Sequence, residues 1–99
     1  MAQYTVYRNS DGAGYLLDVQ SDIVARFSTR VVVPLMAQAD LPDYAKTLNP
    51  VFEIEGELVV MVTQALAAYP GQLLKQPLAS LEGKRDEIVR ALDALFQGI

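Results

Sequence analysis

The 99-residue chain contains no cysteine, no histidine and no tryptophan. Without cysteine it forms neither disulfides nor thiolate metal sites, and a reducing cytoplasm is the expected location. Without histidine it also lacks the commonest general base at neutral pH and the commonest metal ligand. We therefore expect no metal, no cofactor and no enzymatic activity.

Long hydrophobic runs are missing as well. The run VVVPLMA is far shorter than the ~20 residues that a membrane-spanning helix needs. The N-terminal stretch MAQYTVYRNSDG has no basic segment followed by an apolar core, so no signal peptide is predicted. A hydrophobic fraction of 52% and a charged fraction of 20% are typical of a globular protein. We expect one soluble domain spanning residues 1–99.

The basic residues do not form the positive surface that nucleic-acid binding requires. The net charge is -4, and most of the lysines and arginines are scattered along the chain. A small group, Lys84, Arg85 and Arg90, is interleaved with carboxylates between residues 82 and 93. This pattern is typical of a solvated helix face, so no direct binding to nucleic acid is predicted.

The carboxylates do not point to catalysis either. Asp18 and Asp22 are close enough in sequence to form a pair, but the favoured interpretation places Asp18 in solvent on a strand and Asp22 at the cap of a turn. The glutamates of the segment EIEGE alternate, which is typical of an exposed strand face. The segment GAG lacks the spacing of a phosphate-binding loop. What remains is a protein that acts through its surface.

The first two thirds of the chain predict β-structure. Residues 3–9 and 14–20 alternate their side chains between two faces, and the intervening SDGAG predicts a hairpin turn. A second hairpin is predicted over residues 51–63, with Glu55 and Gly56 as its turn. Between the hairpins, RVVVPLM at residues 30–36 predicts a strand covered on both faces.

Three further features have local expectations. Pro34 lacks an N–H group, so it is expected at a sheet edge or a bulge. The segment AQADLPDYAKTLNP is expected to be a connection with a short helical turn around Asp43 to Leu48. The segment AAYPGQLLKQP at residues 67–77 is expected to loop or to form a short strand.

From Ser80 the hydrophobic period changes to that of a helix. Leu81, Ile88, Leu92 and Leu95 share one face, and the opposite face carries Asp86, Arg90, Asp93 and Gln97. Ser80 is the expected N-cap, and Gly98 the residue that ends the helix, with Ile99 folding back after it. The predicted fold is mainly β with one C-terminal α-helix, arranged as a small antiparallel barrel or half-barrel.

Three stretches together resemble the CcdB family of bacterial toxins. They are LDVQSDI at residues 17–23, RVVVPL at residues 30–35, and the terminal helix that ends in Phe96, Gly98 and Ile99. The segments LNPVFEIEGE and MVT follow in the expected order. The six residues of DVQSDI are the most specific part, and the resemblance extends over essentially the whole chain.

The resemblance implies a fold and a function. Members of the family are cytoplasmic homodimers with an SH3-like antiparallel β-barrel and a C-terminal helix. They bind the A subunit of DNA gyrase while cleaved DNA is held open. A partner antitoxin, CcdA, neutralises them through a disordered tail that folds on binding.

The resemblance also implies two sets of contact residues. The expected gyrase contacts are Ile23, Val24, Ala25, Asp93, Phe96, Gln97, Gly98 and Ile99. The expected antitoxin contacts lie in the first hairpin loop and are Arg8, Asn9, Ser10, Asp11, Gly12 and Gly14. Purely structural roles stay open: Ile23 and Val24 as core at a strand end, Phe96 as packing against the barrel, Gly98 as a helix cap, and the hairpin loop as a simple turn.

One position departs from the family pattern. Well-known gyrase poisons of the family end in Trp-Gly-Ile, whereas Gln97 occupies the tryptophan position here. Two hypotheses follow: a working gyrase toxin with an adapted contact, or a homologue that keeps the dimer and antitoxin binding without poisoning gyrase. A third class is a binder of peptides or small molecules in a groove of the barrel.

Overall fold

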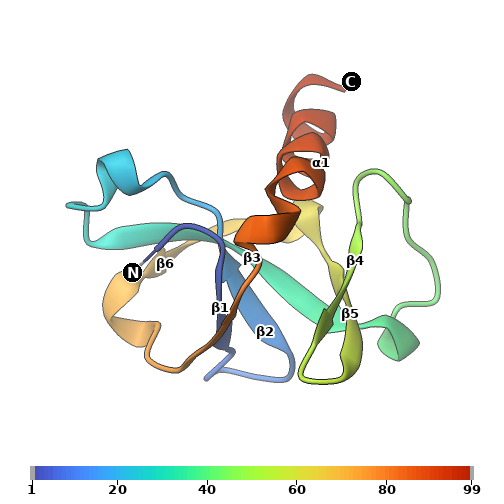
Figure 1. The fold of residues 1–99 in the computed structure, drawn as a ribbon, viewed down its shortest axis with the longest axis horizontal. Helices are drawn as coiled ribbons and strands as arrows, with labels where there is room; N and C mark the ends of the chain where they lie inside the picture. Colours follow the sequence, from blue (N-terminus) through green and yellow to red (C-terminus); the bar gives the residue numbers. More distant parts are fainter. Residues whose placement is uncertain (1, 99) are drawn as a thin grey trace.

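The computed structural model describes residues 2–98 and forms a curled antiparallel sheet of seven strands with one α-helix packed on it (Figure 1). In the sheet the strands follow the order β4-β5-β3-β2-β1-β7, and β6 pairs with β3 beside β5. This half-barrel confirms the predicted fold class. The elements are β1 (Thr5–Arg8), β2 (Tyr15–Asp18), β3 (Thr29–Ala37), β4 (Val51–Ile54), β5 (Glu57–Met61), β6 (Ala67–Pro70), β7 (Pro77–Ser80) and α1 (Arg85–Gln97).

Both predicted hairpins are confirmed. β1 pairs with β2, and β4 pairs with β5, each in antiparallel register. Glu55 and Gly56 have φ angles of 53° and 81°, the left-handed conformation that a two-residue hairpin turn requires. Arg8 lies 3.4 Å from the Glu55 carboxylate, and the Tyr15 hydroxyl lies 3.4 Å from both Glu55 and Glu57. These contacts join the two hairpins.

β3 is the central strand, and Pro34 lies within it rather than at an edge. On one flank β3 pairs with β2; on the other, β6 pairs as far as Val32 and β5 begins opposite Leu35. The carbonyl of Pro34 accepts from the N–H of Val62 at 2.9 Å on this second flank. In a strand the N–H and C=O of one residue point to the same flank. The N–H group that Pro34 lacks would therefore point to the flank where β5 follows β6 as the neighbour of β3.

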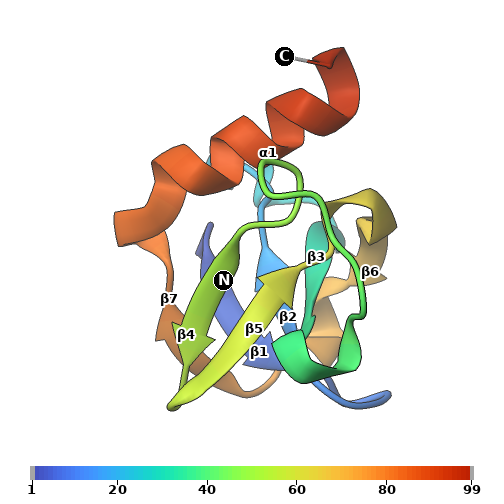
Figure 2. The same cartoon turned by 90° about the vertical axis from the view of Figure 1, so that its right-hand side faces the viewer.

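Two hydrophobic clusters cover the two faces of β3, as predicted for this strand. The larger cluster fills the space between the sheet and α1, and it includes Val33 and Leu35 from β3 and Ile88 from the helix. Figure 2 shows α1 lying across the ends of the strands above this core. The smaller cluster, on the other face, consists of Tyr7, Leu16, Val32 and Leu74.

The helix begins later than predicted. The N–H of Leu81 donates to the carbonyl of Tyr4 at 2.8 Å, so the chain still follows the β1 edge at this residue and is not free to start a helix. Residues 82–84 then form a 3-10 turn, and α1 starts at Arg85. Ser80 is therefore not the N-cap of α1; its hydroxyl accepts from the N–H of Glu82 at 3.2 Å, and Leu81 is the residue that precedes the 3-10 turn.

The helix ends as predicted. Gly98 has a φ of 73°, and its N–H donates to the carbonyl of Ala94 at 3.2 Å, which is the arrangement of a left-handed C-terminal cap. The expectation for Ile99 lies outside the described residues. Within residues 2–98, α1 is neither long nor apolar enough to cross a membrane, and the same holds for the other helical segments.

The connections contain less helix than predicted around Asp43 to Leu48. A 3-10 turn occupies Gln38–Asp40, and residues 46–48 form a single turn closed by a 2.7 Å bond from the N–H of Asn49 to the carbonyl of Ala45. The Asn49 side chain is buried and donates to the carbonyl of Met61 at 3.0 Å. Farther along, β6 confirms the expected short strand.

Candidate functional site

A turn formed by residues 21–28 projects from the sheet between β2 and β3 and carries large apolar side chains in solvent (Figure 1). Ile23 is 92% exposed, Phe27 is 52% exposed and Val24 is 36% exposed. Ala25 is exposed too. The structural role considered for Ile23, as core at a strand end, is therefore wrong. Several large apolar side chains exposed on one short turn are typical of an interaction surface.

The backbone of this turn is ordered by its own hydrogen bonds. Asp22–Val24 is a 3-10 turn, and the Ser21 hydroxyl accepts from the N–H of Ile23 at 3.2 Å. The N–H of Ala25 donates to the carbonyl of Asp22 at 3.2 Å, and that of Phe27 donates to Val24 at 3.3 Å. Local side-chain and backbone bonds of this kind fix a turn that would otherwise sample many conformations.

Asp18 is buried beneath this turn, which corrects the expectation that it faces solvent. Its two carboxylate oxygens accept from Nε and Nη2 of Arg30 at 2.8 and 3.0 Å, and both side chains are fully buried. Asp22 is half-exposed and lies 3.5 Å from the same Nη2. The two carboxylates thus face one guanidinium group, so they do not form an acid–base pair.

Arg30 stays charged in this environment. Burial by itself lowers the pKa of a guanidinium group, but the hydrogen bonds and the charge of Asp18, with a contribution from Asp22, outweigh it and raise the pKa of Arg30. Among the described residues, no partner lies within hydrogen-bonding distance of Arg30 Nη1, although that atom is buried. The contacts between Arg30 and Asp18 are therefore made by Nε and Nη2 of the guanidinium group.

The end of α1 is the second exposed region. Phe96 is 68% exposed, so the alternative structural role considered for it, packing against the barrel, is wrong. Gln97 and Gly98 are exposed as well, whereas Asp93 is half-buried. In Figure 1 the turn of residues 21–28, at the upper left, and the end of α1, at the top, project from the same end of the sheet.

The first hairpin loop lies at the opposite end of the sheet in both views (Figures 1 and 2). The N–H of Asp11 donates to the Asn9 side chain at 3.0 Å, and the Tyr69 hydroxyl donates to the Asp11 carboxylate at 2.6 Å. This second bond raises the pKa of Tyr69. Arg8 stacks over the Tyr15 ring at 5.9 Å. The loop is therefore anchored to β6, and the structure keeps the two expected contact regions apart.

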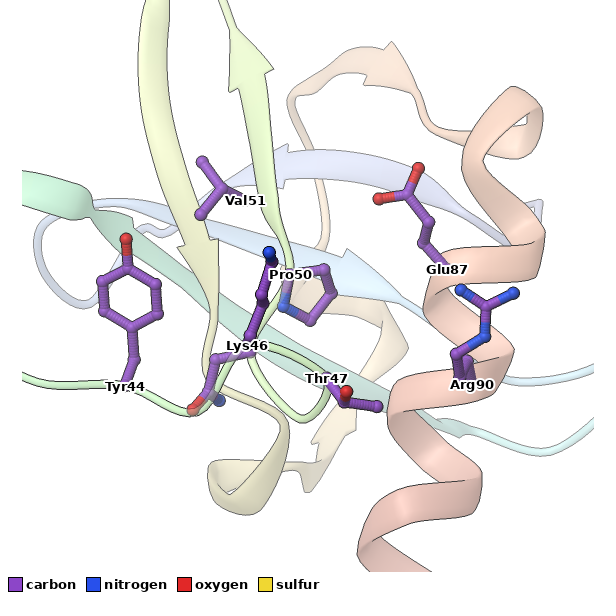
Figure 3. A pocket seen from close by; sticks show the side chains of 8 residues that line it. Tyr44, Lys46, Thr47, Pro50, Val51, Glu87 and Arg90 are labelled. Atoms are coloured by element: carbon purple, nitrogen blue, oxygen red, sulfur yellow. The ribbon is translucent and has the colours of Figure 1, made fainter. Parts of the chain in front are cut away.

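A groove of about 570 Å³ lies between residues 44–51 and α1. Figure 3 shows Tyr44, Lys46 and Thr47 along one side, with Glu87 and Arg90 on the facing side of the helix. Its two walls, residues 44–51 and the α1 residues Glu87 and Arg90, are about 40 residues apart in the sequence. For this reason the sequence pattern did not reveal it. Among residues 2–98, no group of acidic or other metal-binding side chains is placed to hold a metal ion.

Sequence reasoning also missed two contributors to the exposed turn. Phe27 was not predicted to be a site residue, although a phenylalanine between polar residues, as in the segment ARFST, can indicate an exposed aromatic side chain. The guanidinium group of Arg26 lies 5.2 Å from its ring centre. Gln20 is the other, and its role depends on hydrogen bonds that the sequence does not display.

A family model described as CcdB protein matches residues 3–98. The matched region contains the exposed turn, the first hairpin loop and the whole of α1.

Proposed function

This chain belongs to the CcdB family, the toxins of toxin–antitoxin systems, and we propose that it inhibits DNA gyrase by binding the A subunit and trapping the complex with cleaved DNA. The observation that carries the proposal is the nearly complete exposure of Ile23 on an ordered turn. A side chain of this kind gains the free energy of leaving water only when a partner covers it. Full burial of one such side chain contributes roughly 1.5–3 kcal/mol.

The proposed contact surface combines the exposed turn with the end of α1. The two regions share the same end of the sheet, and each has a large exposed apolar side chain, Ile23 and Phe96. Asp93 and Gln97 supply polar groups beside them. The proposed gyrase contacts are Ile23, Val24, Ala25, Asp93, Phe96, Gln97, Gly98 and Ile99.

Gln97 sets the expected strength of this contact. A tryptophan hot spot contributes roughly 2–4 kcal/mol to a protein interface. At about 1.4 kcal/mol per factor of ten, its absence weakens binding about 30- to 1000-fold. Gln97 is exposed, in keeping with its position on the solvated face of α1. The alternative proposal is that the protein retains the fold, the dimer and antitoxin binding but does not poison gyrase, because Gln97 replaces the family tryptophan.

The other proposed partners are an antitoxin and a second copy of the chain. We place the antitoxin contacts in the loop after β1, which is exposed and supplies both charge and hydrogen-bonding groups; the residues are Arg8, Asn9, Ser10, Asp11, Gly12 and Gly14. A homodimer accounts for further exposed apolar side chains, such as Val89 on α1. The proposed location is the bacterial cytoplasm, where gyrase works.

Induced expression in bacteria tests the proposal. Growth arrest together with accumulation of gyrase covalently attached to cleaved DNA is the expected result. A purified-component assay with gyrase and supercoiled plasmid should show the same cleavage complex. Normal growth with abundant folded protein, and no cleavage complex in the purified assay, would contradict gyrase poisoning. Binding of a CcdA-type antitoxin by that same inactive protein would support the alternative.

A further inference from the structure

The exposed turn that carries Ile23 is braced from below, although turns on a protein surface are ordinarily mobile. An apolar anchor on a mobile turn loses conformational freedom when it binds, and that loss reduces affinity. The side chains that hold the turn in place therefore contribute to binding without touching the partner. The side chain with the most direct hold on the turn is Gln20.

Gln20 bridges the central strand and the turn. Its side-chain oxygen accepts from the N–H of Val31 in β3 at 3.0 Å, and its side-chain nitrogen donates to the carbonyl of Val24 at 3.1 Å. One residue earlier, the N–H of Val19 donates to the carbonyl of Val31 at 3.0 Å. The side-chain amide of Gln20 thus replaces the backbone hydrogen bond that would come next between these two segments. It provides an acceptor for the N–H of Val31 while the main chain leaves the sheet and turns.

The backbone of Gln20 is itself fixed by the buried ion pair. Its N–H donates to the Asp18 carboxylate at 3.0 Å, and its carbonyl accepts from Nη2 of Arg30 at 3.2 Å. Near the start of the turn, the Asp22 carboxylate accepts from the N–H of Gln3 at 3.0 Å, and at the far end the carbonyl of Ser28 accepts from the N–H of Gly71 at 2.8 Å. Both ends of the turn are therefore attached to other segments, and Gln20 links the buried ion pair to the 3-10 turn of Ile23.

We infer that Gln20 is a positioning residue that holds Ile23 in the orientation in which the turn docks on its partner. The inference rests on the proposed function, because the partner considered is the gyrase A subunit. Gln20 is half-buried, and both polar atoms of its side chain are used within the protein. Its contribution to binding then acts through the turn.

Gln20→Glu separates the two bonds of this side chain. A carboxylate still accepts from the N–H of Val31, but it has no donor for the carbonyl of Val24. We expect faster amide hydrogen exchange at Val24, Ala25 and Phe27 in the free protein, with unchanged exchange in the core strands. Loss of one hydrogen bond corresponds to about 2- to 10-fold weaker binding to a purified gyrase A fragment.

Gln72→Glu is the matched control, because it introduces the same charge at an exposed residue of the 3-10 turn Gly71–Leu73. It should leave exchange in the turn and gyrase binding unchanged. Gln20→Ala removes both bonds and should exceed Gln20→Glu in each measurement. If Gln20→Ala does not fold, Gln20→Glu alone carries the test, since it keeps the bond to β3.

A double-mutant cycle with Ile23→Ala distinguishes positioning from general destabilisation. If Gln20 acts through Ile23, Gln20→Glu weakens binding in the wild-type background and has little effect once Ile23 is alanine. Equal weakening in both backgrounds would overturn the inference, as would unchanged exchange in the turn. If the wild-type protein does not bind gyrase at all, the proposed function fails together with the inference. If wild type and Gln20→Glu bind equally well, only the inference fails.

Discussion

Asp18 and Arg30 form a two-pronged ion pair in which both side chains are fully buried, at the point where β2 ends and β3 begins. Two charges leave water to form this pair, and the cost of their desolvation offsets most of the attraction. The pair therefore contributes less to net stability than its geometry suggests. We expect its larger effect to be on the register in which β2 and β3 pair.

Removing one member of this pair should be severe. In Arg30→Met the Asp18 carboxylate remains buried without its partner, and the free energy of unfolding should fall by about 3–5 kcal/mol. Urea denaturation followed by circular dichroism measures the change. Lys84→Ala, which removes the exposed pair with Glu87, should cost about 0–1 kcal/mol. Similar losses in the two variants would contradict this account.

A charge at Ile23 should abolish gyrase binding without affecting the fold. Ile23→Asp places a carboxylate where the proposed interface is apolar, so binding should weaken by at least about 30-fold, while the melting temperature stays close to that of wild type because Ile23 is exposed. Leu58→Asp is the control, since Leu58 is an aliphatic residue that is half-exposed and lies on β5. Calorimetric titration with a gyrase A fragment gives the comparison, and equal binding by both variants would locate the contact elsewhere.

Gln97→Trp should increase gyrase binding. The position is exposed near the end of α1, so tryptophan fits there without disturbing the core. We expect about 30- to 1000-fold tighter binding, the reverse of the loss calculated for its absence. Gln97→Phe should give an intermediate gain if apolar area is what matters. No change in either variant would mean that the contact surface differs from that of the tryptophan-containing toxins.

Alkaline pH should destabilise the protein through two tyrosines. Burial raises the pKa of Tyr7 above its ordinary value of 10.0, with the charge of Asp18 adding to the effect. Burial also raises the pKa of Tyr15, and Glu55 and Glu57 add to it. Because the folded state holds these protons more tightly, the stability they contribute is present below pH 10.0 and is lost as pH rises through the folded-state values.

Thermal unfolding at a series of pH values above and below the ordinary tyrosine pKa tests this expectation, with tyrosinate absorbance recorded in parallel. Tyr15→Phe should flatten part of the decline, since it removes one of the raised groups. A melting temperature that stays constant until well after the tyrosines ionise would contradict the assignment. Tyr44→Phe is a suitable control because Tyr44 is exposed.

The sequence predicts the local elements well where the signal is local. The glycine turn at Glu55 and Gly56 determines one hairpin, and the apolar run of β3 indicates a strand covered on both faces. The start of α1 is mispredicted because it depends on a bond between Leu81 and Tyr4, which are far apart in the chain. Capping rules applied to Ser80 do not contain that information.

In the candidate site, too, the sequence does not reveal the features that depend on contacts between distant segments. The resemblance to the family singled out Ile23 and Phe96, and the structure places both side chains in solvent. Asp18 was misplaced because its partner, Arg30, is brought within hydrogen-bonding distance only by the pairing of β2 with β3, in which Val32 lies opposite Asp18. Gln20 was missed for a related reason, since a side chain that replaces a backbone bond has no sequence signature. Tertiary pairing decides these cases, and local propensity does not.

The ion pair also has a consequence for how β3 finds its neighbours. This strand pairs with β2, β5 and β6, so a slip of one residue would break three pairings together. Such a slip exchanges the two faces of the strand. Arg30 would then enter the apolar core beneath α1, while Val31 would face the carboxylate of Asp18. We expect the buried charge, which adds little to net stability, to disfavour this shifted register.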